Sequence, residues 1–208
     1  VADSIRRQSD APVIGMGHSL GALCTFMAAH KYPELFRGLV VMDPPIVNGV
    51  ASLLFALMKL IGQIDRISPS GKSKHRRESW PSREEAKQSL GGKSLFKAFD
   101  PECFDAYIQH GLSDNAAGVS LTIPAATEVA IFRTTPTDVW RYRSPLKVPG
   151  LFIAGAQSEF IKVNFGTRMA RQHNMDYRLT PGGHMFPLEN PEKTAATIRA
   201  GLQQMFPS

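Results

Sequence analysis

The stretch Pro12-Val13-Ile14-Gly15-Met16-Gly17-His18-Ser19-Leu20-Gly21 decides the fold of this chain. Its first five residues are short and apolar, which is typical of a buried parallel strand. From Leu20 onward, apolar residues recur at positions 20, 23, 24 and 27, the spacing of an amphipathic helix. A serine flanked by glycines between a strand and a helix indicates a tight turn that exposes the serine hydroxyl.

The turn explains each residue of the motif. Its backbone is strained at Ser19, and side chains two positions to either side would clash, so we expect glycine to be required at both 17 and 21. The amide of Leu20 stands at the start of the helix, where it points toward the same spot as the serine hydroxyl. The motif therefore predicts a nucleophilic Ser19 with Leu20 as one oxyanion donor.

The flanking sequence extends this strand and helix into a sheet. A second apolar run, residues 39–42, ends at Asp43, and two buried strands joined by a helix form a right-handed βαβ unit. Residues 151–154 and, more weakly, 176–179 predict two further strands. A closing helix begins after Asn190, with Pro191 in its first turn. We predict an α/β fold with a mostly parallel sheet and flanking helices.

Residues 47–146 have a different character and predict a helical insertion. Ser82-Arg83-Glu84-Glu85 is a capping box, Asp100-Pro101 is a second helix start, and Pro124 opens a third helix that runs to Phe132. No strand of the parallel type is evident there. We therefore predict a core of residues 1–46 and 147–208, interrupted by a cap insertion at 47–146.

Composition places limits on the location and partners of the protein. The chain has 208 residues, of which 43% are hydrophobic, and lacks the roughly 18 uninterrupted apolar residues that a transmembrane segment needs. Two cysteines, Cys24 and Cys103, suit reduced thiols in a cytoplasmic protein. The net charge is +6, but the basic cluster at 72–77 contains no aromatic residues. We interpret this cluster as a solvated loop and expect no nucleic-acid partner.

A serine hydroxyl needs a base to accept its proton. In Pro181-Gly182-Gly183-His184, the histidine follows the last strand and precedes the closing helix, so its loop can hang over Ser19 at the sheet edge. We predict that His184 is the base. His18 adjoins the serine, but we expect its side chain to point away. The other histidines lie at a helix end, in a polar helix or in the insertion: His30, His173, His75 and His110.

The base needs an acid to orient it, and the residues offer two candidates. Asp43 ends the strand after the nucleophile helix, on the same edge as Ser19. After the 151–154 strand the chain reads Gly155-Ala156-Gln157-Ser158-Glu159, with serine where an aspartate is expected and Glu159 one position late. We favour Asp43, with Glu159 as the alternative. A purely structural Asp-Pro turn at Asp43 is the third interpretation.

These motifs resemble those of α/β-hydrolases. Residues 12–45 resemble the nucleophile elbow and the strand after it, residues 183–191 resemble the histidine loop, and the insertion resembles the helical cap. The haloalkane-dehalogenase-like branch places its acid as Asp43 is placed, but attacks with an aspartate where this chain has Ser19. The resemblance implies hydrolysis of an ester, thioester or similar acyl bond through an acyl-serine, with no metal or organic cofactor.

Two other functions remain open: a carbon–carbon bond hydrolase with the same triad, and a non-catalytic relative that binds a ligand or partner. A small apolar acyl substrate suits the apolar residues of the insertion, namely Leu53, Leu54, Phe55, Leu57, Met58 and Phe132.

One departure from the family concerns the elbow strand. Family members have three or four strands before the elbow and a His-Gly motif that supplies a second oxyanion amide. Here the only such pair, His110-Gly111, lies in the insertion. We expect additional polypeptide, upstream or in another chain, to pair with the strand at 13–16 and to supply that amide.

Overall fold

A computed structural model describes residues 1–45 and 50–207 of the chain. It divides into two compact units, Val1–Ile46 with Val139–Ser208, and Val47–Asp138. The second boundary lies earlier than the predicted 146/147, because Val139, Tyr142 and Leu146 pack against the core of the first unit.

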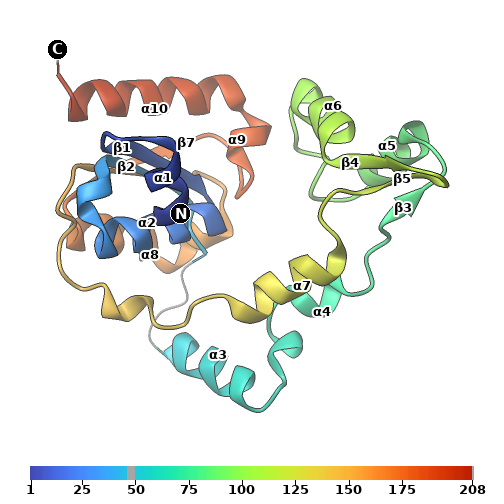
Figure 1. The fold of residues 1–208 in the computed structure, drawn as a ribbon, viewed down its shortest axis with the longest axis horizontal. Coiled ribbons are helices and arrows are strands. Elements are labelled where there is room, and N and C mark those ends of the chain that lie inside the picture. Colours follow the sequence, from blue (N-terminus) through green and yellow to red (C-terminus); the bar gives the residue numbers. More distant parts are fainter. Residues whose placement is uncertain (46–49, 208) are drawn as a thin grey trace. The chain divides into compact units, whose positions relative to one another are not determined.

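The first unit is built on a four-stranded parallel sheet of order β1-β2-β6-β7 (Figure 1). The strands are β1 (Val13–His18), β2 (Phe36–Met42), β6 (Gly150–Gly155) and β7 (Met175–Thr180). Each neighbouring pair is parallel. The predicted parallel α/β fold is confirmed, and all four predicted strands are present.

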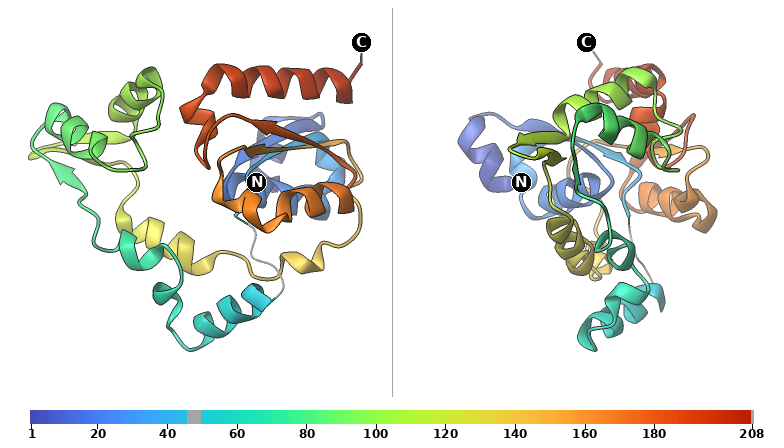
Figure 2. Two further views of the ribbon diagram at one scale, coloured as in Figure 1. Left: turned by 180° about the vertical axis from the view of Figure 1, so that it is seen from behind. Right: turned by 90° about the vertical axis from the view of Figure 1, so that its right-hand side faces the viewer.

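Helices cover both faces of this sheet. In Figure 1 and Figure 2, α10 (Pro191–Met205) lies on one face, and α2 (Leu20–Lys31) and α8 (Phe165–Gln172) lie on the other. Alternate strand residues enter opposite cores: Leu39 and Val41 pack on the α2 side, whereas Val40 and Met42 pack on the α10 side. Burial on both faces explains the continuous apolar runs of the sequence. The unit also contains α1 (Ala2–Gln8), η1 (Pro33–Leu35), η3 (Val139–Arg141), η4 (Glu159–Val163) and α9 (Phe186–Glu189).

The start of α10 differs in one detail from the sequence prediction. Asn190 precedes the helix and Pro191 opens it, as expected, but the Asn190 side chain does not accept a hydrogen bond from the helix. Its amide instead donates to the carbonyl of Pro181 at 3.2 Å. This contact ties the closing helix to the loop that carries His184.

The second unit contains the predicted helices together with a small sheet. Ser82 Oγ accepts from the Glu85 N–H, and Asp100 Oδ1 accepts from the amides of Glu102 and Cys103, so both predicted helix starts are confirmed. The helices are α3 (Val50–Leu60), η2 (Ile64–Arg66), α4 (Ser70–Ser73), α5 (Arg83–Gly91), α6 (Pro101–His110) and α7 (Ala125–Thr134).

The predicted helical insertion also contains three short strands that the sequence did not indicate, and none of them is of the parallel type. β3 (Ser79–Trp80), β5 (Gly118–Leu121) and β4 (Leu112–Asn115) form an antiparallel sheet. Strands of two to four residues are too short to show an alternating hydrophobic pattern in the sequence.

Three residues of the basic cluster at 72–77 are paired with carboxylates. Lys74 lies 2.6 Å from Asp65, and Arg77 lies 2.7 Å from Glu85. Arg76 contacts Glu128 at 3.0 Å.

Within the described ranges, no helix is long and apolar enough to cross a membrane.

In the part of the chain that the structure describes, β1 forms one edge of the parallel sheet, with β2 as its neighbour. The expected pairing of β1 with additional polypeptide stays a prediction.

Two histidines are packed together in the core of the first unit. The rings of His30 and His173 have centroids 5.0 Å apart, and both lie edge-on to Phe26. His173 Nδ1–H donates to the carbonyl of Ser144, whereas His30 Nε2 is buried without a hydrogen-bond partner among the described residues. Burial, assisted by His173, lowers the pKa of His30 to about 4. Burial also lowers the pKa of His173.

These shifts predict how stability depends on pH. The ordinary pKa of histidine, 6.5, applies to the unfolded chain, which therefore binds more protons than the folded one between pH 6.5 and about 4. Stability should fall as the pH drops through this window. His30→Phe should reduce the fall in urea midpoint between pH 7 and pH 4.5, whereas His110→Gln, at an exposed site, should leave it unchanged. Equal pH dependence in His30→Phe and wild type would contradict the assignment.

Candidate active site

The turn between β1 and α2 has the strained backbone that the sequence predicted. Ser19 has φ 53° and ψ −123°, in the region that residues with a side chain rarely adopt. Its N–H donates to the carbonyl of Met42 on β2 at 2.9 Å, and its carbonyl accepts from the N–H of Leu23 in α2 at 3.2 Å. The serine is thus fixed by the neighbouring strand and by the helix that it precedes.

The two glycines of the motif have different roles. A Cβ at position 17 would lie 2.4 Å from the backbone carbonyl carbon and oxygen of Gly21, so glycine is required there. A Cβ at position 21 would meet nothing within 4 Å. The expectation that both glycines relieve a clash is therefore right for Gly17 and wrong for Gly21, since the close approach is made by the Gly21 backbone.

The structure brings Ser19, His184 and Asp43 into one hydrogen-bonded chain. His184 Nε2 lies 3.0 Å from Ser19 Oγ, and His184 Nδ1 lies 2.7 Å from Asp43 Oδ2. The three residues follow β1, β7 and β2 at the carboxyl edge of the sheet. The Asp43 side chain is 2% exposed and that of His184 is 26% exposed, so the carboxylate is buried behind a ring that solvent reaches.

Asp43 is also anchored through its backbone. Its φ is 45°, and its N–H donates to the carbonyl of Ile153 on β6 at 2.9 Å. The carboxylate contacts the ring of His184, which favours the predicted acid over a purely structural Asp-Pro turn. Glu159, the alternative acid, is exposed at the start of η4.

Ser158 was not among the residues predicted for the site, but it contacts Asp43. This serine is 2% exposed, and its Oγ donates to Asp43 Oδ2 at 2.6 Å. It occupies the position where an aspartate was expected, three residues after Gly155. This position could have identified Ser158 from the sequence, because a polar residue there lies at the same sheet edge as Asp43.

The expectation that His18 points away from the site is wrong. Its Nε2–H donates to the backbone carbonyl of His184 at 2.8 Å, and the two rings have centroids 4.9 Å apart. Burial lowers the pKa of His18, and the hydrogen bond to His184 opposes that shift. Phe160 contacts the His184 ring edge-on, with centroids 5.0 Å apart. His184 is therefore held by aromatic contacts and through its own backbone.

Leu20, the predicted oxyanion donor, follows Ser19 directly at the start of α2. It is the first residue of α2, so its N–H is one of the four that have no acceptor within a helix. The N-terminus of a helix carries a partial positive charge, which favours a negative charge developing next to Ser19 Oγ.

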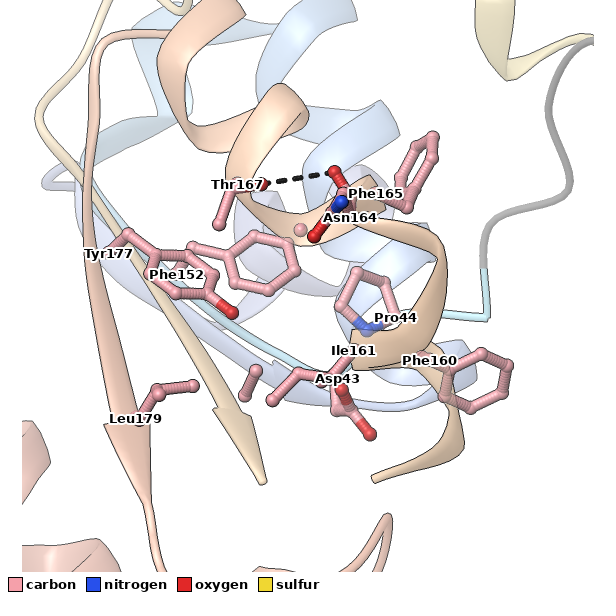
Figure 3. A pocket seen from close by; sticks show the side chains of 12 residues that line it. Asp43, Pro44, Phe152, Phe160, Ile161, Asn164, Phe165, Thr167, Tyr177 and Leu179 are labelled. Carbon is pink, nitrogen blue, oxygen red and sulfur yellow. Dashed lines mark hydrogen bonds between the residues drawn. The ribbon is translucent and has the colours of Figure 1, made fainter. Parts of the chain in front are cut away.

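An apolar cavity of about 190 Å³ lies beside the acid in the same unit. Figure 3 shows Asp43 and Phe160 toward one side of it and Tyr177 and Leu179 toward the other. Burial, with the charge of Asp43, raises the pKa of Tyr177. Ser19 is not part of the lining, so this cavity adjoins Asp43 and not Ser19. The other lining residues are Pro44, Phe152, Ala154, Ile161, Asn164, Phe165, Gly166 and Thr167.

The family model for the alpha/beta hydrolase family matches residues 1–197. The chain therefore belongs to the alpha/beta hydrolase family, and the predicted resemblance is confirmed.

Two curated fungal proteins are similar to this chain over different lengths. An abhydrolase domain-containing protein, AFT2-1 of Alternaria alternata, is 21% identical over 235 residues, covering 93% of this chain and 84% of the relative. The type I acyl-CoA thioesterase mpaH of Penicillium brevicompactum is 32% identical over 109 residues, covering 52% of this chain and 23% of the relative.

Among solved structures, E-2-(acetamidomethylene)succinate hydrolase superposes with a TM-score of 0.73 at 20% identity, over 97% of this chain and 70% of that one. The thioesterase domain from the curacin biosynthetic pathway has a TM-score of 0.70 at 16% identity, over 95% of this chain and 70% of that one. At this level of identity the structures show a shared fold.

The elbow packing predicts unequal effects of two similar substitutions. Gly17→Ala should lower the free energy of unfolding by about 1–3 kcal/mol or more, because the new methyl group overlaps the backbone of α2. Gly21→Ala should change it by less than about 1 kcal/mol, since the site is open and alanine favours the helix. Urea unfolding followed by circular dichroism measures both. Equal losses in the two variants would argue against this packing.

Proposed function

We propose that this chain is a serine hydrolase that cleaves an ester or related acyl bond of an apolar substrate through an acyl-serine intermediate. The observation that carries the proposal is the continuous hydrogen-bonded chain from Ser19 Oγ through His184 to Asp43. Membership of the alpha/beta hydrolase family supports hydrolase activity in general.

Each group has a defined part in the proposed reaction. Ser19 Oγ attacks the acyl carbon as its proton passes to His184 Nε2, and the ionised Asp43 stabilises the resulting imidazolium. The Leu20 amide donates to the oxygen that becomes negative. His184 then protonates the leaving group, and the acyl group stays on Ser19. A water molecule, deprotonated by His184, attacks the acyl carbon, and release of the acid restores the serine.

We assign the acid to Asp43 and not to Glu159. Asp43 Oδ2 lies 2.7 Å from His184 Nδ1, in a position to fix the tautomer that leaves Nε2 as the acceptor. Glu159 is exposed, so water solvates its charge. The second oxyanion amide is part of the same proposal and is expected from additional polypeptide.

The substrate is proposed to carry an apolar acyl group. In the second unit, α3 exposes Leu53, Leu54 and Leu57, at 72%, 48% and 52%. Exposed leucines at helical spacing form an apolar face that suits a substrate of the same character. The similarity to an acyl-CoA thioesterase over 109 residues supports including thioesters among the candidate bonds.

The nucleophile is tested with a fluorophosphonate probe and nitrophenyl esters of increasing chain length. Ser19→Ala should abolish labelling and lower kcat by about 10⁴-fold or more. Ser94→Ala, at an exposed serine of the second unit, should react as wild type does. Activity of Ser19→Ala within tenfold of wild type would exclude the assignment. Failure of the wild-type chain to label would favour the non-catalytic binding protein.

The acid is tested by a pair of charge-removing substitutions. Asp43→Asn should lower kcat by about 10⁴-fold, because an amide favours the wrong tautomer of His184. Glu159→Gln should have little effect. Steady-state kinetics on the same nitrophenyl ester compare the two, and the reverse order would move the acid to residue 159.

A further inference from the structure

One oxygen of the Asp43 carboxylate accepts two hydrogen bonds. Oδ2 lies 2.7 Å from His184 Nδ1 and 2.6 Å from Ser158 Oγ. Asp43 and Ser158 are each 2% exposed, so water does not solvate this end of the chain of hydrogen bonds. A buried carboxylate depends on protein donors, and Ser158 supplies one of the two on this oxygen.

The Ser158 hydroxyl donates to Asp43 and accepts from a backbone amide. Ser158 precedes η4 as its N-cap. Its Oγ accepts a hydrogen bond from the N–H of Phe160 at 3.3 Å. An ionised carboxylate has no proton to give, so the hydroxyl proton of Ser158 is directed at Asp43. The Ser158 backbone N–H donates to the carbonyl of Gly155 at 2.9 Å, so the turn after β6 holds the serine in place by itself.

The Ser158–Asp43 hydrogen bond comes from the end of β6, which contributes no residue to the proposed triad. Met42 of β2 is in register with Ile153 of β6, which places the turn at Asp43 beside the turn at Ser158. Each parallel strand thus contributes one side chain to a continuous network: Ser19 after β1, Asp43 after β2, Ser158 after β6 and His184 after β7.

We propose that Ser158 is a positioning residue for the acid, an inference that rests on the proposed function. Its hydroxyl holds Asp43 Oδ2 against His184 Nδ1 and takes up part of the negative charge of the carboxylate. A donor to the charged form of an acid weakens the pull of that acid on a neighbouring proton. Ser158 therefore sets both the orientation of the acid and the basicity of His184.

The test follows the rate at which a fluorophosphonate labels the full chain between pH 5 and pH 9. Ser158→Ala should lower the second-order rate constant by about 10- to 100-fold. It should also move the midpoint of the acidic limb to higher pH, because Asp43 then acts on the imidazolium with its charge unshared. Ser158→Thr, which keeps the hydroxyl, should restore the rate and the midpoint.

A matched control exists in the second unit. Ser70 is fully buried, and its Oγ donates to Asp65 Oδ1 at 2.8 Å. Ser70→Ala therefore removes a serine–aspartate hydrogen bond from a buried serine, although Asp65 itself is partly exposed, and should label at the wild-type rate with the wild-type midpoint. Where Ser158→Ala fails to melt cooperatively, Ser158→Cys keeps the size of the side chain with a weak donor, and the same loss and shift are expected.

Two results would overturn the inference while leaving the proposed function in place. The first is a Ser158→Ala variant that labels within twofold of wild type with the same midpoint. The second is a rate loss with an unmoved midpoint, which indicates a structural role only. Absence of labelling in the wild-type chain would instead remove the proposed function, and the inference with it.

Discussion

The carboxyl ends of four parallel strands meet at one edge of the sheet, and every group of the candidate site depends on that constraint. The site residues are tied to neighbouring strands by their own backbone: Ser19 donates to Met42, and Asp43 donates to Ile153. Their side chains therefore start from positions that the sheet register fixes. The loops determine only the direction of each side chain, because adjacent strands are a few ångströms apart.

Backbone strain accompanies this arrangement at two of the site residues. Ser19 and Asp43 both have positive φ, at 53° and 45°, which costs about 1–3 kcal/mol for each residue outside the preferred regions. Glycine would adopt either conformation more easily, but the proposed chemistry needs a hydroxyl and a carboxylate. The strain persists because the surroundings fix both turns: the Gly21 backbone packs against Gly17, and two interstrand hydrogen bonds hold the amides.

Much of this architecture could be predicted from local sequence patterns. Apolar runs buried on both faces identified the strands, and the change to helical spacing at Leu20 identified the elbow. The position of His184 between the last strand and the closing helix identified the proposed base. Such patterns report which residues are buried and in which element, because periodicity follows directly from backbone geometry.

What the sequence could not supply depends on side-chain direction and on contacts between distant segments. The orientation of His18 toward the His184 carbonyl joins residues 166 positions apart, and no periodicity encodes it. The proposed preference for Asp43 over Glu159 rests on which residue faces inward at the end of a strand. The short strands β3, β4 and β5 and the packing of Val139 on the first core were missed for the same reason.

The distribution of charge at the sheet edge connects these observations. Asp43 and Ser158 end adjacent strands and share one buried hydrogen bond. A carboxylate at both positions would place two like charges in contact away from water, and one of them would have to take up a proton. A hydroxyl at 158 avoids that conflict and provides a donor for the charge at 43. Glu159 does not compete, because it is exposed and its charge is solvated. Ser158 stands where an aspartate was expected. A serine there is consistent with an acid that follows β2, because two buried carboxylates in contact would not both stay ionised.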